Sequence, residues 1–118
     1  MRVVHDPADG ESTTLATEVE VADTFLQQAL GLMFRRSIPD DYALVFPFDG
    51  VGRRDTHMVF VPFPIDVVWL VDGEVEAVRE LRPWRGLAAA EADTLIELPA
   101  GTADGVAVGD ELRVSGLD

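Results

Sequence analysis

The sequence of 118 residues contains neither cysteine nor lysine, so its nine Lys or Arg positions are all arginine. The absence of cysteine excludes disulfides, thiol nucleophiles and Cys-ligated zinc or iron–sulfur clusters. The absence of lysine excludes the phosphate-binding loop that needs a lysine and Schiff-base catalysis through a side-chain amine.

Positive charge is scarce as well, because 22 Asp and Glu residues leave a formal net charge of −13. Such a surface repels nucleic acid and anionic membranes, whose phosphates bind clustered Lys and Arg. Abundant acid without lysine keeps a surface hydrated in molar salt, where charges are screened over about 3 Å. We therefore predict a halophilic source and expect neither a nucleic-acid nor a membrane partner.

Long apolar runs are also missing, since none approaches the roughly 18 residues of a membrane span. Residues 1–6 lack the apolar stretch of a signal peptide, so we expect a cytoplasmic protein. A hydrophobic content of 47% argues against disorder. The length predicts a single domain over residues 1–118. We also expect no cofactor and a monomer.

Alternation with a period of two dominates the chain and predicts strands. Residues 1–14 read as an N-terminal strand and turn, and residues 15–22 as a half-buried strand that forms a hairpin with it. Asp72-Gly73, between two apolar segments, predicts another hairpin. The predicted fold class is mainly β (α+β), a small β-barrel-like domain of about seven or eight strands.

One helix is predicted in the N-terminal half, at about residues 23–34. Thr24 can cap it, and Gln27 completes a capping box. Apolar residues follow at spacings of three and four, so we expect the core to be faced by Phe25, Leu26, Leu30 and Met33. The alanine-rich residues 88–92 are expected to form one further helical turn.

The densest group of titratable side chains is Arg53, Arg54, Asp55 and His57, and Trp84 lies between two more arginines. Two guanidinium groups near a histidine could bind a carboxylate or phosphate, and an exposed Trp could stack on a ligand. The structural alternative is that these arginines pair with surface acids. Two histidines are too few for a His-only metal site, so we expect no metal.

Several blocks follow one another in an order that resembles the prokaryotic family called domain of unknown function 192, over about residues 15–114. They are Gly31-Leu32-Met33-Phe34-Arg35, then Ala43 to Phe48, Met58 with Pro64-Ile65-Asp66, and Leu95 to Gly101. The resemblance implies a compact β-rich fold, here of a haloarchaeal type, and transfers no established activity. The family usually has Trp before the Met that corresponds to Met58, and Lys, Asn and Thr after it. Here the four positions are His57, Val59, Phe60 and Val61, which are mostly apolar.

Asp66 is an acid inside an apolar run, where an unsatisfied charge costs several kcal/mol. We predict an ion pair with Arg35, which closes the expected helix and could reach Asp66 with two hydrogen bonds.

Two classes of function follow from these residues. The first is a non-enzymatic module, adapted to high salt, that binds a small molecule or a protein segment near Arg53, Arg54, Asp55, His57 and Trp84. The alternative is a small hydrolase-like enzyme that uses Asp55 or Asp66 with His57. We prefer the binding module, because no pair of nucleophile and base can be identified.

Overall fold

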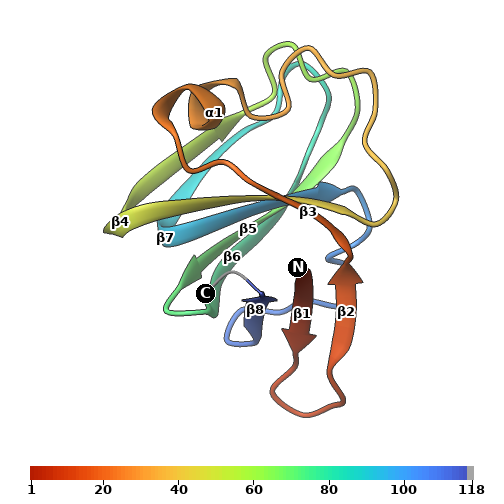
Figure 1. Ribbon diagram of the computed structural model, residues 1–118, viewed down its shortest axis with the longest axis vertical. Helices are drawn as coiled ribbons and strands as arrows, with labels where there is room; N and C mark the ends of the chain where they lie inside the picture. Colours follow the sequence, from red (N-terminus) through yellow and green to blue (C-terminus); the bar gives the residue numbers. More distant parts are fainter. Residues whose placement is uncertain (117–118) are drawn as a thin grey trace.

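The computed structural model describes residues 1–116 and contains one eight-stranded sheet and one short helix (Figure 1), which confirms the mainly β fold class. The elements in chain order are β1 (Arg2–Asp6), β2 (Thr13–Ala16), β3 (Glu18–Val21), α1 (Phe25–Leu30), β4 (Tyr42–His57), β5 (Ile65–Val71), β6 (Glu74–Leu81), β7 (Leu87–Pro99) and β8 (Glu111–Ser115).

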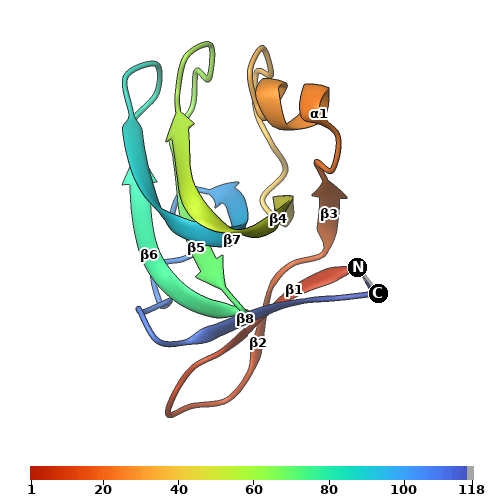
Figure 2. The same cartoon turned by 90° about the vertical axis from the view of Figure 1, so that its left-hand side faces the viewer.

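The strands follow the order β2-β1-β8-β6-β5-β7-β4-β3, and all described pairs are antiparallel except β3 with β4. The sheet curves strongly (Figure 2), but β2 and β3 at its two edges do not pair, so the barrel-like sheet stays open. Asp72 and Gly73 both have positive φ, the geometry expected for the predicted β5–β6 hairpin.

Strand β5, residues 42–46 of β4 and residues 95–98 of β7 are buried on both faces, which explains why these stretches are almost entirely apolar. One face packs toward α1 and its neighbouring loops, around Leu44, Phe46, Val67, Trp69 and Leu95. The other face packs under β1, β8 and residues 100–110, around Val45, Val68, Leu70, Ile96 and Leu112. The curved sheet therefore separates two hydrophobic cores.

The helix is shorter than predicted and turns its apolar side chains outward. Its capping box is present, with Gln27 N donating to Thr24 Oγ1 at 3.1 Å, but the helix ends at Gly31 instead of near residue 34. Phe25 is 89% exposed, because the inward position belongs to Gln28, which donates to the carbonyls of Ala22 and Pro47 at 2.9 and 2.8 Å. The expectation that Phe25, Leu26 and Leu30 face the core is wrong.

Residues 88–92 are a strand, not the expected helical turn. They form the first half of β7, where Ala88 pairs with Thr56 and Ala90 with Arg54. Pairing with β4 overrides the helix preference of alanine. Within residues 1–116, no helix is long and apolar enough to cross a membrane.

Candidate functional site

A cavity of about 190 Å³ lies between α1 and the concave face of the sheet. Helix α1 and the turn after it form one wall, and β4 and β7 form the floor. Most of the lining is apolar, and a few polar groups converge within it, as in sites that bind small molecules. The residues that line it are Gln28, Ala29, Leu30, Gly31, Leu32, Met33, Phe46, Phe48, Asp55, Thr56, His57, Val61, Ile65, Leu95 and Glu97.

Glu97 is the acidic group at the floor of this cavity and is only 5% exposed. Strand alternation directs it to the same face as Leu95, toward α1 instead of solvent. Its Oε2 accepts a hydrogen bond of 2.9 Å from Thr56 Oγ1. Thr56 is itself buried on β4, so the pair forms a small polar site in an apolar wall.

Burial raises the pKa of Glu97 to about 7, because a carboxylate removed from water loses most of its hydration. The hydrogen bond from Thr56 and the positive charge of Arg35 oppose this rise. The side chain therefore changes protonation state near neutral pH, and a cation beside it would favour the ionised form.

The second carboxylate oxygen of Glu97 faces the turn that follows α1. A Cβ atom added at Gly31 would lie 3.8 Å from Glu97 Oε1 and 3.6 Å from the Phe46 ring. Among the described residues, Thr56 bonds to Oε2 and no hydrogen bond reaches Oε1, which is partly accessible, because no fully buried side-chain oxygen lacks a partner. This oxygen is a free acceptor for a donor placed in the cavity.

The predicted cluster on β4 is divided between the two faces of the strand. Arg53 and Asp55 lie on the exposed face, where Arg53 Nε donates to Asp55 Oδ1 at 3.0 Å. Arg54 points the other way, with its guanidinium 4.1 Å from the centre of the Phe48 ring and hydrogen bonds to the carbonyls of Ala92 and Gly50. These contacts favour the structural alternative, in which the arginines are held by groups of the chain itself, over a site in which both arginines bind one anion.

His57 and Trp84 are both exposed; strand alternation puts His57 on the same face of β4 as Arg53 and Asp55, whereas Trp84 is not on β4. His57 Nδ1 accepts a hydrogen bond of 3.2 Å from Val59 N, and the residue borders the cavity together with Asp55. Trp84 has a positive φ of 66° in the β6–β7 loop and meets the edge of the Phe60 ring. A ligand role for the predicted residues stays a prediction.

Of the residues required by the hydrolase alternative, Asp55 and His57 both border the cavity, whereas Asp66 is not among the residues that line it. His57 pairs with Leu87 at the start of β7, and Asp66 pairs with Leu98 near its end. Asp66 Oδ2 accepts hydrogen bonds from Gly101 N and Ala103 N at 3.0 and 2.8 Å. Burial is the main cause that raises the pKa of Asp66, and these two bonds oppose the rise.

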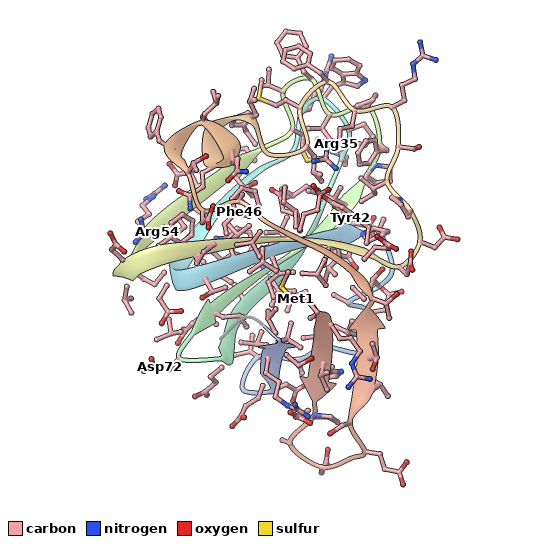
Figure 3. All side chains as sticks on the ribbon, viewed as in Figure 1. Met1, Arg35, Tyr42, Phe46, Arg54 and Asp72 are labelled. Atoms are coloured by element: carbon pink, nitrogen blue, oxygen red, sulfur yellow. The ribbon has the colours of Figure 1, made fainter. Side chains whose placement is uncertain are left out.

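The expected ion pair between Arg35 and Asp66 is not formed within residues 1–116. Arg35 Nη1 instead donates to Tyr42 Oη at 2.9 Å and lies 3.3 Å from Glu20 Oε1 (Figure 3). The Tyr42 hydroxyl donates to the same Glu20 oxygen at 2.7 Å, and this bond is the main cause that lowers the pKa of Glu20. The loop amides satisfy Asp66, and Arg35 instead ties the turn after α1 to β3 and β4.

Two further groups of titratable side chains lie on the opposite face of the sheet. His5 Nε2 donates to Asp110 Oδ2 at 2.8 Å, and Asp110 also accepts from Ala8 N and Ala107 N, which joins the first hairpin to the loop before β8. Carboxylate oxygens of Asp66, Glu80 and Asp104 lie within 4.8 Å of one another. This acidic trio offers oxygen ligands of the kind that hard cations prefer.

Glu97 and Thr56 are the site residues that the sequence reasoning missed. A signal for Glu97 was present, because it is an acid inside the apolar run Leu95 to Leu98, the same feature that singled out Asp66. Thr56 gave no signal of its own, since a threonine in a strand is ordinary.

Comparison with known proteins finds a matching family model and several relatives similar in sequence. The family model DUF192, described as uncharacterized ACR, matches residues 6–114. UPF0127 proteins of Pyrococcus horikoshii and Pyrococcus furiosus are each 36% identical over 102 residues, covering 81% of this chain and 86% and 85% of theirs.

Two solved structures share the fold. A proposed transcription regulator from Sinorhizobium meliloti is 28% identical with a TM-score of 0.85, covering 95% of this chain and 91% of its own. A protein of unknown function from Novosphingobium aromaticivorans is 22% identical with a TM-score of 0.84, covering 97% and 84%.

Proposed function

The chain belongs to the DUF192 family, whose members are uncharacterised, and we propose that this member is a small-molecule-binding module adapted to high salt. The observation that carries the proposal is Oε1 of Glu97, a partly accessible carboxylate oxygen without a hydrogen bond, on a side chain that is otherwise buried in the lining of the cavity beneath α1. A ligand that donates a hydrogen bond to this oxygen and binds only the folded state would stabilise the folded chain.

The ligand class follows from the lining of the cavity. A volume of about 190 Å³ is smaller than the usual range of roughly 300–1,000 Å³, so the ligand is small. The walls formed by Phe46, Ile65 and Leu95 favour an apolar body. Glu97 favours a protonated amine or another hydrogen-bond donor at one end. We therefore assign the cavity to a compact, apolar amine.

Adaptation to high salt is supported by the composition of the surface. The acidic side chains of β6 and β8 alternate with buried apolar residues, so Glu74, Glu76 and Glu111 face solvent. Acids spread over an outer face in this way hold water and counterions.

The binding proposal can be tested by thermal unfolding in molar KCl with three probes that share one ring. Cyclohexylamine, cyclohexanol and cyclohexanecarboxylate present a cation, a neutral donor and an anion, respectively. A ligand at about 100 times its Kd adds roughly 2.7 kcal/mol to the stability of the folded state. We expect the Tm to rise most with the amine, less with the alcohol and not at all with the carboxylate.

The variant Glu97→Gln should lose the preference for the amine over the alcohol. Glu91→Gln is the matched control, because Glu91 lies on the same strand but is exposed. Equal shifts with all three probes, or a preference that survives in Glu97→Gln, would contradict the proposal.

A further inference from the structure

The acidic residues of this chain are absent from one end of the molecule. Residues 24–39, 56–65 and 81–90 contain four arginines and no Asp or Glu, although the whole chain has 22 acids. These segments contain α1, residues 31–39 of the α1–β4 loop, and the whole of the β4–β5 and β6–β7 loops. Figures 1 and 2 both show α1 and these loops gathered at the same end of the molecule. We call this end the acid-free tip.

Most of the exposed hydrophobic surface lies on the same tip. Eight of the eleven large hydrophobic side chains that are exposed in residues 1–116 belong to it, and only Met1, Val51 and Val108 lie elsewhere. Concentrated exposed apolar surface marks an interaction site, whereas scattered exposed residues do not. The eight are Phe25, Leu26, Leu30, Phe34, Val59, Phe60, Trp84 and Leu87.

Three aromatic residues at the centre of the tip are held in place before any partner arrives. The rings of Phe34 and Phe60 stack with their centres 4.8 Å apart, and Trp84 meets Phe60 edge-on at 6.4 Å. Phe34 N donates to Phe60 O at 2.8 Å, and Trp84 N donates to Val61 O at 3.0 Å.

All three aromatic residues adopt a positive φ, between 59° and 68°. Bulky side chains rarely occupy this backbone region, and strain that the surrounding structure maintains is concentrated at functional sites. The loops therefore present a fixed aromatic surface despite its conformational cost.

Arginines without ion pairs lie within two residues of Phe34 and Trp84 in the chain. Arg36, Arg82 and Arg85 are exposed, and none forms an ion pair with an acid of the described chain. The positive ends of two copies would repel each other, and the acidic remainder of the molecule opposes extended polyanions such as DNA or a membrane. Aromatic residues with Arg, and without Asp or Glu, are the typical composition of the centre of a protein interface.

We propose that the acid-free tip docks a short acidic and apolar segment of a partner protein. The apolar side chains of the segment cover Phe34, Phe60 and Trp84, and its carboxylates reach the neighbouring arginines. In molar salt only contacts within about 3 Å escape screening, so the aromatic contacts provide affinity and the arginines select the sign of charge.

The test uses a fluorescein-labelled peptide that alternates Asp or Glu with Leu or Phe, and a second peptide with Lys at every acidic position. Fluorescence anisotropy is measured in KCl from about 0.5 to 3 M. We expect only the acidic peptide to bind, with a blue shift of Trp84 emission. Trp84→Ala with Phe34→Ala should weaken binding roughly tenfold or more at every salt concentration.

Reversing the charge of the arginines separates the electrostatic contribution to peptide binding from the contribution of the aromatic residues. Arg36→Glu with Arg85→Glu should weaken binding most at the lower salt concentrations, whereas Arg2→Glu, on β1 away from the tip, should leave it unchanged. Far-UV circular dichroism checks that each variant is folded.

Four outcomes of the binding experiments would overturn the proposal, and a fifth comes from sedimentation. They are equal binding of the Lys peptide, no binding of the acidic peptide, binding that survives the aromatic substitutions, and binding only of anionic vesicles or single-stranded oligonucleotides. A dimer in sedimentation that Trp84→Ala dissociates would identify a second copy of the chain as the occupant instead, and would also overturn it.

Discussion

Thr56 and Glu97 share a hydrogen bond of 2.9 Å although they are far apart in the ladder between β4 and β7. Thr56 pairs with Ala88 and Glu97 with Leu44, at opposite ends of that ladder. The register shift between Pro47 and Gly52 bends the two strands, so their far ends meet across the concave face. The bond therefore depends on the curvature of the sheet and places the carboxylate beneath α1.

The first prediction concerns the pH dependence of stability. The pKa of Glu97 is about 7 in the folded chain and 4.5 as a model value, so the folded state holds a proton that the unfolded state releases. Stability should therefore fall as pH rises from about 4.5 to 7, by about 3 kcal/mol from this group. Glu97→Gln should remove this fall in urea unfolding in molar KCl, and Glu91→Gln should retain it.

The second prediction concerns Gly86 in the β6–β7 loop. A Cβ atom there would lie 2.8 Å from Leu81 Cβ and from Met58 Cγ, and 2.9 Å from Arg82 O. Gly86→Ala should therefore destabilise the fold by roughly 1–3 kcal/mol, because backbone cannot move aside cheaply. Gly105→Ala is the control, since nothing lies within 4 Å of its added Cβ. Equal Tm values for the two variants would contradict the expectation.

The third prediction concerns Asp110, which accepts bonds from His5, Ala8 and Ala107. The hydrogen bond from His5 is the main cause that lowers the pKa of Asp110 below 3.8. Its stabilising effect is present above that pH and is lost as the pH falls through the lowered value. Asp110→Asn should lower the Tm at pH 7 and reduce the acid sensitivity below pH 4. Thermal unfolding followed by circular dichroism at both pH values measures this, with the exposed Asp49→Asn as control.

The fourth prediction concerns salt. Self-repulsion at a net charge of −13 destabilises the compact state unless counterions screen it. The Tm should therefore rise steadily in KCl between about 0.1 and 3 M, and the rise should be smaller when exposed Glu18, Glu76 and Glu91 are replaced by Gln. A Tm that is independent of KCl would exclude the proposed adaptation.

The sequence predicts the strands and hairpins well, because alternation and turn chemistry are local. The capping box at Thr24 and the Asp72-Gly73 hairpin are both where their residues indicate. The orientation of α1 could not be predicted in this way. Its apolar spacing suggested a core-facing helix, but Gln28 takes the inward position through two backbone carbonyls that are distant in sequence.

The candidate site is less accessible to sequence reasoning than the fold. The rule that an acid in an apolar run is unusual identified Asp66 and applies equally to Glu97. Their partners depend on tertiary structure, because the amides of Gly101 and Ala103 reach Asp66 and the curved sheet brings Thr56 to Glu97. A contact that forms because the sheet bends produces no periodic pattern in the sequence.

The pairing of β1 with β8 has a consequence for how the domain is made. Arg2 pairs with Ser115 and Asp6 with Glu111, so the first of the eight strands of the sheet to be translated has the last of the eight as its neighbour. At roughly 5–20 residues per second, β1 waits several seconds without one of its two neighbouring strands. The second core closes only when β8 arrives, and folding is therefore completed after synthesis of the domain, not during it.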